Sequence, residues 1–348
     1  MDFSYPKHKT TFMAPILLLL VLLMPALQIT GAQSAGVCYG RNGNNLPADT
    51  EVVDLYKANG IGRIRIYEPN QATLEALKGS NIEVTVTILN NLLQGLTDAA
   101  AATDWVQKNV QPYSADVKFR YIAVGNEVHP GDAVAQYLLP AIQNIQNAIT
   151  AANLQGQIKV STAIDTTLLG VSTNFPPSNG AFSDAGNSLI SPIINFLGSN
   201  GAPLLINVYP YFAYVLDPVN IKLDYALFTS PGVVVQDGSN GYQNLFDALL
   251  DTQYSALEKA GAPNLQIVVS ESGWPSEGGD AATVGNAGTY YKNLINHVKT
   301  GTPKRPNGAI ETYLFAMFDE NLKTGAEVEK HFGIFFPNKQ PKYQLTFG

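Results

Sequence analysis

Residues 119–127 read FRYIAVGNE, an apolar run that ends in a carboxylate, Glu127. Residues 266–271 read QIVVSE, a second apolar run, and it ends in Glu271. Strands of parallel sheets are buried on both faces, so they read as nearly continuous apolar runs. The two stretches therefore predict two strands of one parallel sheet, each with a carboxylate at its carboxyl end.

Runs of this kind recur along the chain and alternate with longer amphipathic segments. The predicted strands are Gly36–Gly40, Arg63–Tyr67, Glu83–Leu89, Phe119–Gly125, Ile158–Ile164, Leu204–Tyr209, Gln266–Ser270 and Glu311–Phe318. The predicted helices are Thr50–Asn59, Asn70–Gly79, Ala100–Val110, Ala133–Ala152, Ser188–Leu197, Tyr242–Lys259 and Ala281–Lys299. Eight strands in this alternation predict a closed (β/α)8 TIM barrel. An open doubly wound sheet also alternates, but the first strand here is not followed by a G-x-G-x-x-G loop.

The first 32 residues are typical of a secretory signal. A short basic region at 7–9 precedes an apolar stretch at 12–27, and small residues at 30–32 offer a cleavage site. The alternative, a membrane anchor, needs about 20 apolar residues, and this stretch is shorter and interrupted by two prolines. Since no low-complexity linker or block of charge divides the rest, we expect a signal at 1–32 and a single catalytic domain at 33–348.

The composition excludes several classes of protein. The chain of 348 residues is 45% hydrophobic and 14% charged, whereas disordered chains have few apolar residues and many charges. A net charge of −7 argues against a nucleic-acid partner, which is bound through Lys and Arg. The single cysteine, Cys38, lies inside the first predicted strand and indicates an inert buried thiol. The histidines after the signal, His129, His297 and His331, have no metal-binding spacing, so we expect neither a metal nor a cofactor.

The two carboxylates lie where a barrel enzyme places its chemistry. In a TIM barrel the active site forms where the strands end and the following loops begin, and Glu127 and Glu271 both follow apolar strands at that end. Cleavage of a glycosidic bond requires such a pair, one carboxyl protonated with a raised pKa and its partner ionised. The alternative for each residue is a rim carboxylate in an ion pair with Lys or Arg.

Longer stretches around these residues resemble the plant glucan endo-1,3-β-glucosidases of glycoside hydrolase family 17. The similarity covers the whole chain after the signal. The matching segments are GVCYG at 36–40, RIY at 65–67, VGNEV at 124–128, NVYPYF at 207–212, SNGYQNLFD at 239–247, VVSESGWP at 268–275, ETYLFAMFDEN at 311–321 and EKHFG at 329–333. One departure is LNNLL at 89–93, where relatives often carry an acidic residue, and it could alter a subsite.

The resemblance implies that Glu271 is the nucleophile and Glu127 the general acid/base. Protonated Glu127 would donate to the leaving glycosidic oxygen while ionised Glu271 attacks the anomeric carbon. Water activated by Glu127 would then release the glycosyl-enzyme with net retention. This mechanism predicts carboxylates about 5–5.5 Å apart, against roughly 6.5–9.5 Å for inversion.

Further residues are expected to bind the substrate. Tyr67 and Tyr209 end the second and sixth predicted strands, so their hydroxyls should point into the same mouth, and the resemblance places them near the cleaved sugar. Asn126, beside the acid, is expected to hydrogen-bond the sugar 2-hydroxyl, or else to cap the end of its strand. His129, two residues past the acid, either tunes it or lies in a surface loop.

Two aromatic residues and three charged residues complete the predicted site. Alternation along the last strand puts Phe318 on the same face as Glu320, where its ring would stack on a pyranose, or it is an ordinary core side chain. The ring of Trp274 would likewise stack on a sugar, or Trp274 is an ordinary core side chain. By the resemblance, Glu320, Lys323 and Glu329 lie around the cleft in auxiliary roles, and the alternative is a solvated Glu–Lys pair on a loop.

The resemblance also implies a substrate and a place of action. We expect a secreted endo-hydrolase of β-1,3-glucan, such as callose or fungal wall glucan, in plant defence or cell-wall remodelling. The alternatives are a relative that acts on mixed 1,3-1,4-β-glucan or transfers glycosyl units, and a non-enzymatic glycan-binding barrel. The acidic charge and the lack of a C-terminal extension favour the extracellular space, apoplast or cell wall. We expect a monomer with no membrane association once the signal is removed.

Overall fold

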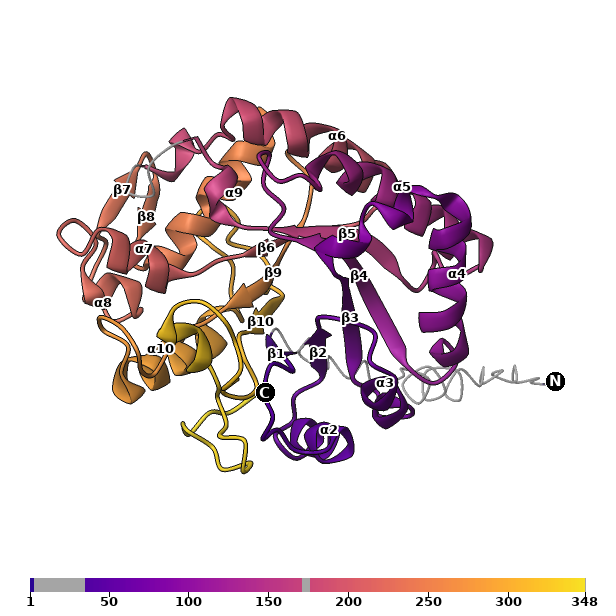
Figure 1. The fold of residues 1–348 in the computed structure, drawn as a ribbon. Coiled ribbons are helices and arrows are strands. Elements are labelled where there is room, and N and C mark those ends of the chain that lie inside the picture. The colour runs from indigo at the N-terminus through magenta and orange to yellow at the C-terminus, as the bar shows by residue number, and fades with distance from the viewer. Residues whose placement is uncertain (3–34, 171–175, 348) are drawn as a thin grey trace. The chain divides into compact units, whose positions relative to one another are not determined.

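The computed structural model describes residues 1–2, 35–170 and 176–347, so the predicted signal at 1–32 lies outside the described residues except for Met1 and Asp2. From residue 35 onward, parallel strands close into a barrel in the order β1-β10-β9-β6-β5-β4-β3-β2 (Figure 1). The strands are β1 (Ala35–Tyr39), β2 (Arg63–Ile66), β3 (Glu83–Ile88), β4 (Lys118–Asn126), β5 (Lys159–Ile164), β6 (Leu204–Asn207), β9 (Ile267–Ser272) and β10 (Thr312–Leu314). This closed ring confirms the predicted (β/α)8 TIM barrel and each of its eight strands.

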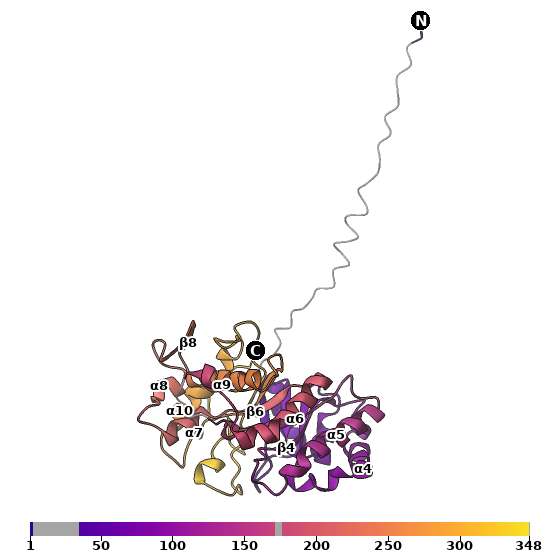
Figure 2. The same ribbon diagram turned by 90° about the horizontal axis from the view of Figure 1, so that it is seen from above.

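The helices lie outside the ring of strands, as two perpendicular views show (Figures 1 and 2). The longer ones are α2 (Asp49–Ala58), α3 (Gln71–Leu77), α4 (Ala99–Asn109), α5 (Ala135–Ala151), α6 (Asp184–Asn200), α9 (Leu245–Lys259) and α10 (Val284–His297). Short 3-10 turns are η1 (Asn90–Leu92), η2 (Gly95–Thr97), η3 (Gln111–Tyr113), η4 (Thr166–Leu168), η5 (Pro177–Asn179) and η6 (Glu327–Lys330). Polar side chains cap several first turns, as Ser183 does for α6 by accepting from the N–H of Gly186. Each of the seven predicted helices is present.

An insertion between β6 and α9 was not predicted from the sequence patterns. Helices α7 (Pro210–Leu216) and α8 (Leu223–Ala226) are followed by an antiparallel hairpin of β7 (Val235–Asp237) and β8 (Asn240–Tyr242). The hairpin and the two helices lie on the same flank of the barrel in Figures 1 and 2. Since β7 and β8 have three residues each, they carry too little alternation to reveal a strand.

The polarity of the barrel interior changes along the barrel axis. At the amino ends of the strands, Arg120 donates two hydrogen bonds of 2.9 and 2.7 Å to Glu311. Next comes a cluster of mostly apolar side chains, which includes Cys38, Tyr121, Ala123, Ala163, Leu205, Val268 and Tyr313. Toward the carboxyl ends the buried inward residues include the polar Arg65 and Asn207. Polar groups therefore gather at the end where a TIM barrel carries its active site.

The described residues contain no helix that is both long enough and apolar enough to cross a membrane.

Candidate active site

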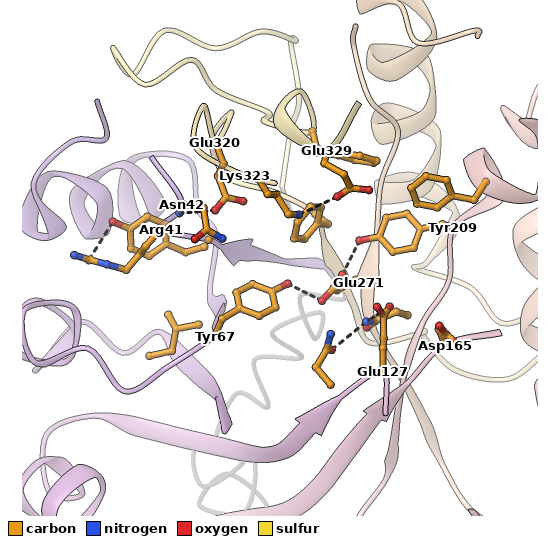
Figure 3. A pocket seen from close by; sticks show the side chains of 18 of the residues that line it. Arg41, Asn42, Tyr67, Glu127, Asp165, Tyr209, Glu271, Glu320, Lys323 and Glu329 are labelled. Atoms are coloured by element: carbon orange, nitrogen blue, oxygen red, sulfur yellow. Dashed lines mark hydrogen bonds and ion pairs between the residues drawn. The ribbon is translucent and has the colours of Figure 1, made fainter. Parts of the chain in front are cut away.

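A cavity of about 750 Å³ opens at the carboxyl ends of the barrel strands (Figure 3). Its walls include residues at or just after the ends of all eight barrel strands. The predicted site residues that line it are Tyr67, Asn126, Glu127, Tyr209, Glu271, Glu320, Lys323 and Glu329. The fold thus brings both predicted catalytic carboxylates into one cavity.

Glu271, in β9, is buried and accepts hydrogen bonds on both carboxylate oxygens. Its Oε1 accepts from the hydroxyl of Tyr67 at 2.7 Å and from Nη1 of Arg65 at 2.8 Å. Its Oε2 accepts from the hydroxyl of Tyr209 at 2.6 Å. Figure 3 shows the two tyrosines pointing toward the carboxylate from opposite sides. Donors on both oxygens, one of them a cation, stabilise an ionised carboxylate, the state that a nucleophilic carboxylate requires.

Glu127 follows β4, which β5 and β6 separate from β9 in the barrel, and it lines the same cavity. Burial, followed by repulsion from Glu271, raises the pKa of its carboxyl to about 7. The Nδ2 of Asn207 donates to Oε1 of Glu127 at 2.9 Å and opposes this rise in pKa, and the nearby Asp165 adds to it. A substantial share of Glu127 is therefore protonated at neutral pH, as a general acid must be.

Arg65, in β2, is a central residue of the site that sequence reasoning missed. It is fully buried, and besides Glu271 it donates to Oδ1 of Asn126 at 2.7 Å and to Oδ1 of Asn207 at 3.1 Å. Burial alone would lower the pKa of Arg65, but the acidic side chains around it, which include Tyr67 and Glu271, outweigh burial and raise the pKa above its ordinary value. The signal in the sequence was a cation inside a buried strand, because such a charge requires an anionic partner.

Asn126 and Asn207 link the two carboxylates. Asn207 donates to Glu127 and accepts from Arg65, which in turn binds Glu271. Oδ1 of Asn126 accepts from Arg65 and, at 3.2 Å, from Nδ2 of Asn207. The predicted hydrogen bond from Asn126 to a sugar hydroxyl stays a prediction. In the structure the side-chain oxygen Oδ1 of Asn126 accepts hydrogen bonds from Arg65 and Asn207.

The charged residues after β10 form the opposite wall of the cavity (Figure 3). Glu320 is buried, accepts from the backbone N–H of Asn42 at 2.8 Å, and has a pKa raised mainly by burial. Lys323 pairs with Glu329 at 3.1 Å and lies 4.1 Å from the ring centre of Phe315. A Cβ at Gly40 would collide with the carboxylate of Glu320, so this wall depends on a glycine there. The solvated-pair alternative is wrong for Glu320.

The expectation that Trp274 stacks on a sugar is wrong, because Trp274 has no exposed surface. Its ring packs 5.1 Å from that of Tyr211 and 5.5 Å from that of Tyr290, and its Nε1 donates to the carbonyl of Ala281 at 3.0 Å. Strand β9 ends at Ser272, two residues earlier, and the chain then turns into the core between strands and helices.

Phe318 is likewise a core residue, 2% exposed, with its ring centre 6.2 Å from that of Tyr39. The argument for stacking assumed a strand that alternates as far as Glu320. Strand β10 ends at Leu314, so the alternation does not extend to Phe318. The aromatic rings that do line the cavity, apart from the tyrosines already described, include Phe212, Phe315 and Phe332.

His129 lies beside the site, and Cys38 lies beneath it. Nε2 of His129 is 3.0 Å from Oδ2 of Asp165, and this contact outweighs partial burial and raises the pKa of the imidazole. His129 lies in the loop after β4 with its side chain 41% exposed, as the surface-loop interpretation expects, and its partner Asp165 lines the cavity. Burial raises the pKa of the Cys38 thiol well above its ordinary value, which agrees with an inert side chain. The described part of the chain has no group of three or more His, Cys, Asp or Glu side chains arranged to hold a metal ion.

Comparison with known proteins assigns the class. The family described as glycosyl hydrolases family 17 matches residues 35–347. The chain belongs to this family.

Individual relatives cover nearly the whole chain. A glucan endo-1,3-beta-glucosidase of Vitis vinifera is 65% identical over 336 residues, which are 95% of this chain and 96% of the relative. An acidic glucan endo-1,3-beta-glucosidase isoform of Nicotiana tabacum is 54% identical over 97% of this chain and 98% of its own length. Among solved structures, a beta-1,3-glucanase and allergen of Cryptomeria japonica pollen aligns with a TM-score of 0.87 at 50% identity, over 90% of this chain and 99% of that one.

The burial of Trp274 predicts the effect of replacing it. Trp274→Phe removes a hydrogen bond and part of a buried ring, so we expect the free energy of unfolding to fall by about 1–3 kcal/mol. The KM for the glycan substrate should not change. Thermal unfolding and steady-state kinetics measure the two effects. Phe212→Leu, at a half-buried ring that does line the cavity, is the matched comparison and should raise KM. A raised KM in Trp274→Phe with unchanged stability would contradict the assignment to the core.

The coupling between the carboxylates predicts a change in the titration of Glu127. In Glu271→Gln the repulsion by a second carboxylate is removed, so the pKa of Glu127 should fall below about 7. Burial, the largest cause, remains and should keep this pKa above the ordinary value for glutamate. A ¹³C NMR titration of labelled glutamate side chains measures it. Asp165→Asn removes a weaker repulsion and should give a smaller fall, whereas an unchanged or higher pKa in Glu271→Gln contradicts the coupling.

Proposed function

We propose that the chain is a retaining endo-hydrolase that cleaves internal β-1,3-glucosidic bonds of β-1,3-glucans. The observation that carries this proposal is the unlike environment of two carboxylates in one cavity. Glu127 is partly buried with a raised pKa, while Glu271 is held by a cation and two hydroxyls. The names of the relatives, glucan endo-1,3-beta-glucosidase at 65% and 54% identity, support the linkage.

In the first step, Glu127 donates its proton to the glycosidic oxygen while Glu271 attacks the anomeric carbon. The bond to the leaving sugar breaks, and a covalent bond between the anomeric carbon and a Glu271 oxygen forms. As Glu271 loses its negative charge, the repulsion that raises the pKa of Glu127 disappears. Glu127 is then an ionised carboxylate, ready to act as the base toward water.

In the second step, Glu127 accepts a proton from water, and the water oxygen attacks the anomeric carbon. Glu271 leaves as a carboxylate, and the hydroxyls of Tyr67 and Tyr209 together with Arg65 stabilise the returning charge. Two inversions at one carbon give net retention, and this mechanism predicts a spacing of about 5–5.5 Å between the carboxylates.

The cavity wall suits a neutral sugar chain. Besides the carboxylates it presents tyrosine, asparagine and phenylalanine side chains, which offer hydroxyl and amide groups for hydrogen bonds and rings for the apolar faces of sugars.

We further propose that residues 1–32 are a secretory signal, that residues 33–348 are the catalytic domain, and that the protein acts outside the cell as a monomer. The basic, apolar and small-residue regions of the first 32 residues support secretion. A role in plant defence or wall remodelling follows from callose and fungal wall glucan as substrates. The relatives include both acidic and basic vacuolar isoforms, and the net charge of −7 resembles the acidic group.

Removal of either carboxylate is expected to abolish most of the activity for different reasons. Glu271→Gln removes the nucleophile and should lower kcat on laminarin by about 10³-fold or more. Glu127→Gln removes the proton donor and should lower kcat by about 10²–10⁴-fold. Release of reducing ends measures both effects. Glu277→Gln, at a carboxylate that is 76% exposed, is the matched control and should retain full activity. Intact cleavage by Glu271→Gln would overturn the assignment of the nucleophile.

The products of laminarin test the proposed reaction as a whole. Time-resolved ¹H NMR should show the β-anomer of the new reducing end first, and chromatography should show oligosaccharides of several lengths from the start. Parallel digestion of barley glucan tests the alternative of a mixed-linkage substrate. Initial α-anomer would contradict retention, glucose as the sole early product would contradict endo action, and faster cleavage of barley glucan would contradict the proposed linkage.

A further inference from the structure

The end of β4 lacks a neighbouring strand on one side. Strand β3 ends at Ile88, which pairs with Val124, whereas β4 continues to Asn126. In a parallel ladder the N–H and C=O groups of a residue bond to the same neighbouring strand. The backbone groups of Asn126 on the β3 side would therefore have no strand to bind, although buried backbone groups need partners.

The side chain of Asn90 takes the place of that strand. The backbone N–H of Asn126 donates to Oδ1 of Asn90 at 2.8 Å, and Nδ2 of Asn90 donates to the backbone carbonyl of Asn126 at 2.8 Å. A single amide side chain thus satisfies both backbone groups, as a further residue of β3 would. Asn90 begins the turn η1, two residues after β3 ends, and it does not line the cavity.

The backbone on either side of Asn126 is bent by two left-handed residues. Gly125 has a φ of 75° and Glu127 a φ of 51°, and this region is unfavourable for a residue with a side chain such as Glu127. A Cβ at residue 125 would lie 3.0 Å from a terminal carbon of Leu138, so the limited space there also favours glycine. Such conformations persist only where the surroundings hold them. Here the supports are Asn90 on the β3 side and, on the β5 side, a 2.8 Å hydrogen bond from the N–H of Glu127 to the carbonyl of Ala163.

We propose that Asn90 is a positioning residue that aims the acid/base Glu127 at the glycosidic oxygen, an inference that rests on the function proposed above. It acts through the backbone of Asn126 and does not touch the substrate. The nucleophile has separate supports, since Glu271 is held by Tyr67, Tyr209 and Arg65 from other strands. Loss of Asn90 also disturbs one partner of Arg65, the side chain of Asn126, but leaves the contacts of Arg65 with Glu271 and Ser270.

Two substrates separate this role from a general contribution to folding. The sugar that leaves laminarin needs a proton from Glu127, whereas 2,4-dinitrophenolate leaves an aryl β-laminaribioside without one. The value of kcat/KM reports only the first chemical step in both cases. Asn90→Ala should lower kcat/KM on laminarin by about 10²-fold, since a displacement of about 1 Å at a catalytic group has this effect. On the dinitrophenyl substrate kcat/KM should change by no more than about threefold, because proton donation is not needed there.

Two further variants control the experiment. Asn91→Ala makes the same chemical change at the adjacent, exposed residue and should behave as the wild type. Asn90→Asp keeps an acceptor for the N–H of Asn126 but loses the donor to its carbonyl, so its loss on laminarin should be intermediate. Thermal unfolding establishes whether each variant is folded. If Asn90→Ala is not folded, Asn90→Asp takes its place in the comparison of the two substrates.

The outcomes distinguish this inference from the proposed function. If the wild type fails to cleave laminarin, the proposed function is wrong. If the wild type cleaves laminarin and Asn90→Ala loses activity equally on both substrates, Asn90 has only a structural role. If Asn90→Ala cleaves laminarin as fast as Asn91→Ala, Asn90 does not position the acid, and the inference is equally contradicted.

Discussion

The buried guanidinium of Arg65 is the charge around which the site is arranged. A cation with no exposed surface in the interior of a barrel loses the solvation of water and must recover it from oriented acceptors. Glu271 supplies the opposite charge, and the side-chain carbonyls of Asn126 and Asn207 supply two further acceptors. These residues come from β2, β9, β4 and β6, so a single cation fixes the ends of four strands relative to one another.

The same arrangement separates the roles of the two carboxylates. Glu271 has the cation and two hydroxyls, whereas the polar partner of Glu127 is the neutral amide of Asn207. Burial and the charge of Glu271 then raise the pKa of Glu127 to about 7. Two groups of one chemical type thus have different surroundings, which is the general way in which one site provides for both kinds of chemistry. The difference arises because Arg65 lies next to Glu271.

The sequence was informative where a pattern is repeated and local. Buried parallel strands are apolar runs with polar ends, so the barrel and the positions of Glu127 and Glu271 could be predicted. The ends of the second and sixth predicted strands likewise indicated Tyr67 and Tyr209, which line the cavity. Alternation misled at Phe318, where the strand had already ended, and the short strands of the hairpin at 235–242 have no recognisable period.

What could not be predicted depends on side chains from distant strands. Arg65 looked like one more residue of a predicted strand, because its partners lie 61 and 206 residues away along the chain. Asn90 was considered only within the stretch 89–93, as a possible change in a subsite, because the unpaired strand end it binds is revealed only by the register of β3 and β4. Trp274 was left with two interpretations, a sugar-binding ring or a core side chain, and the turn after β9 directs it into the core.

The central claim is that Glu271 forms a covalent bond with the substrate while Glu127 exchanges the proton. Trapping with a 2-deoxy-2-fluoro-β-laminaribiosyl fluoride tests it most directly, because the fluorine at C2 slows breakdown of the glycosyl-enzyme and a good leaving group keeps its formation possible. After proteolysis, mass spectrometry of the labelled peptide should find the added disaccharide on Glu271. A label on Glu127 or another residue, or inactivation without any covalent label, would contradict the account.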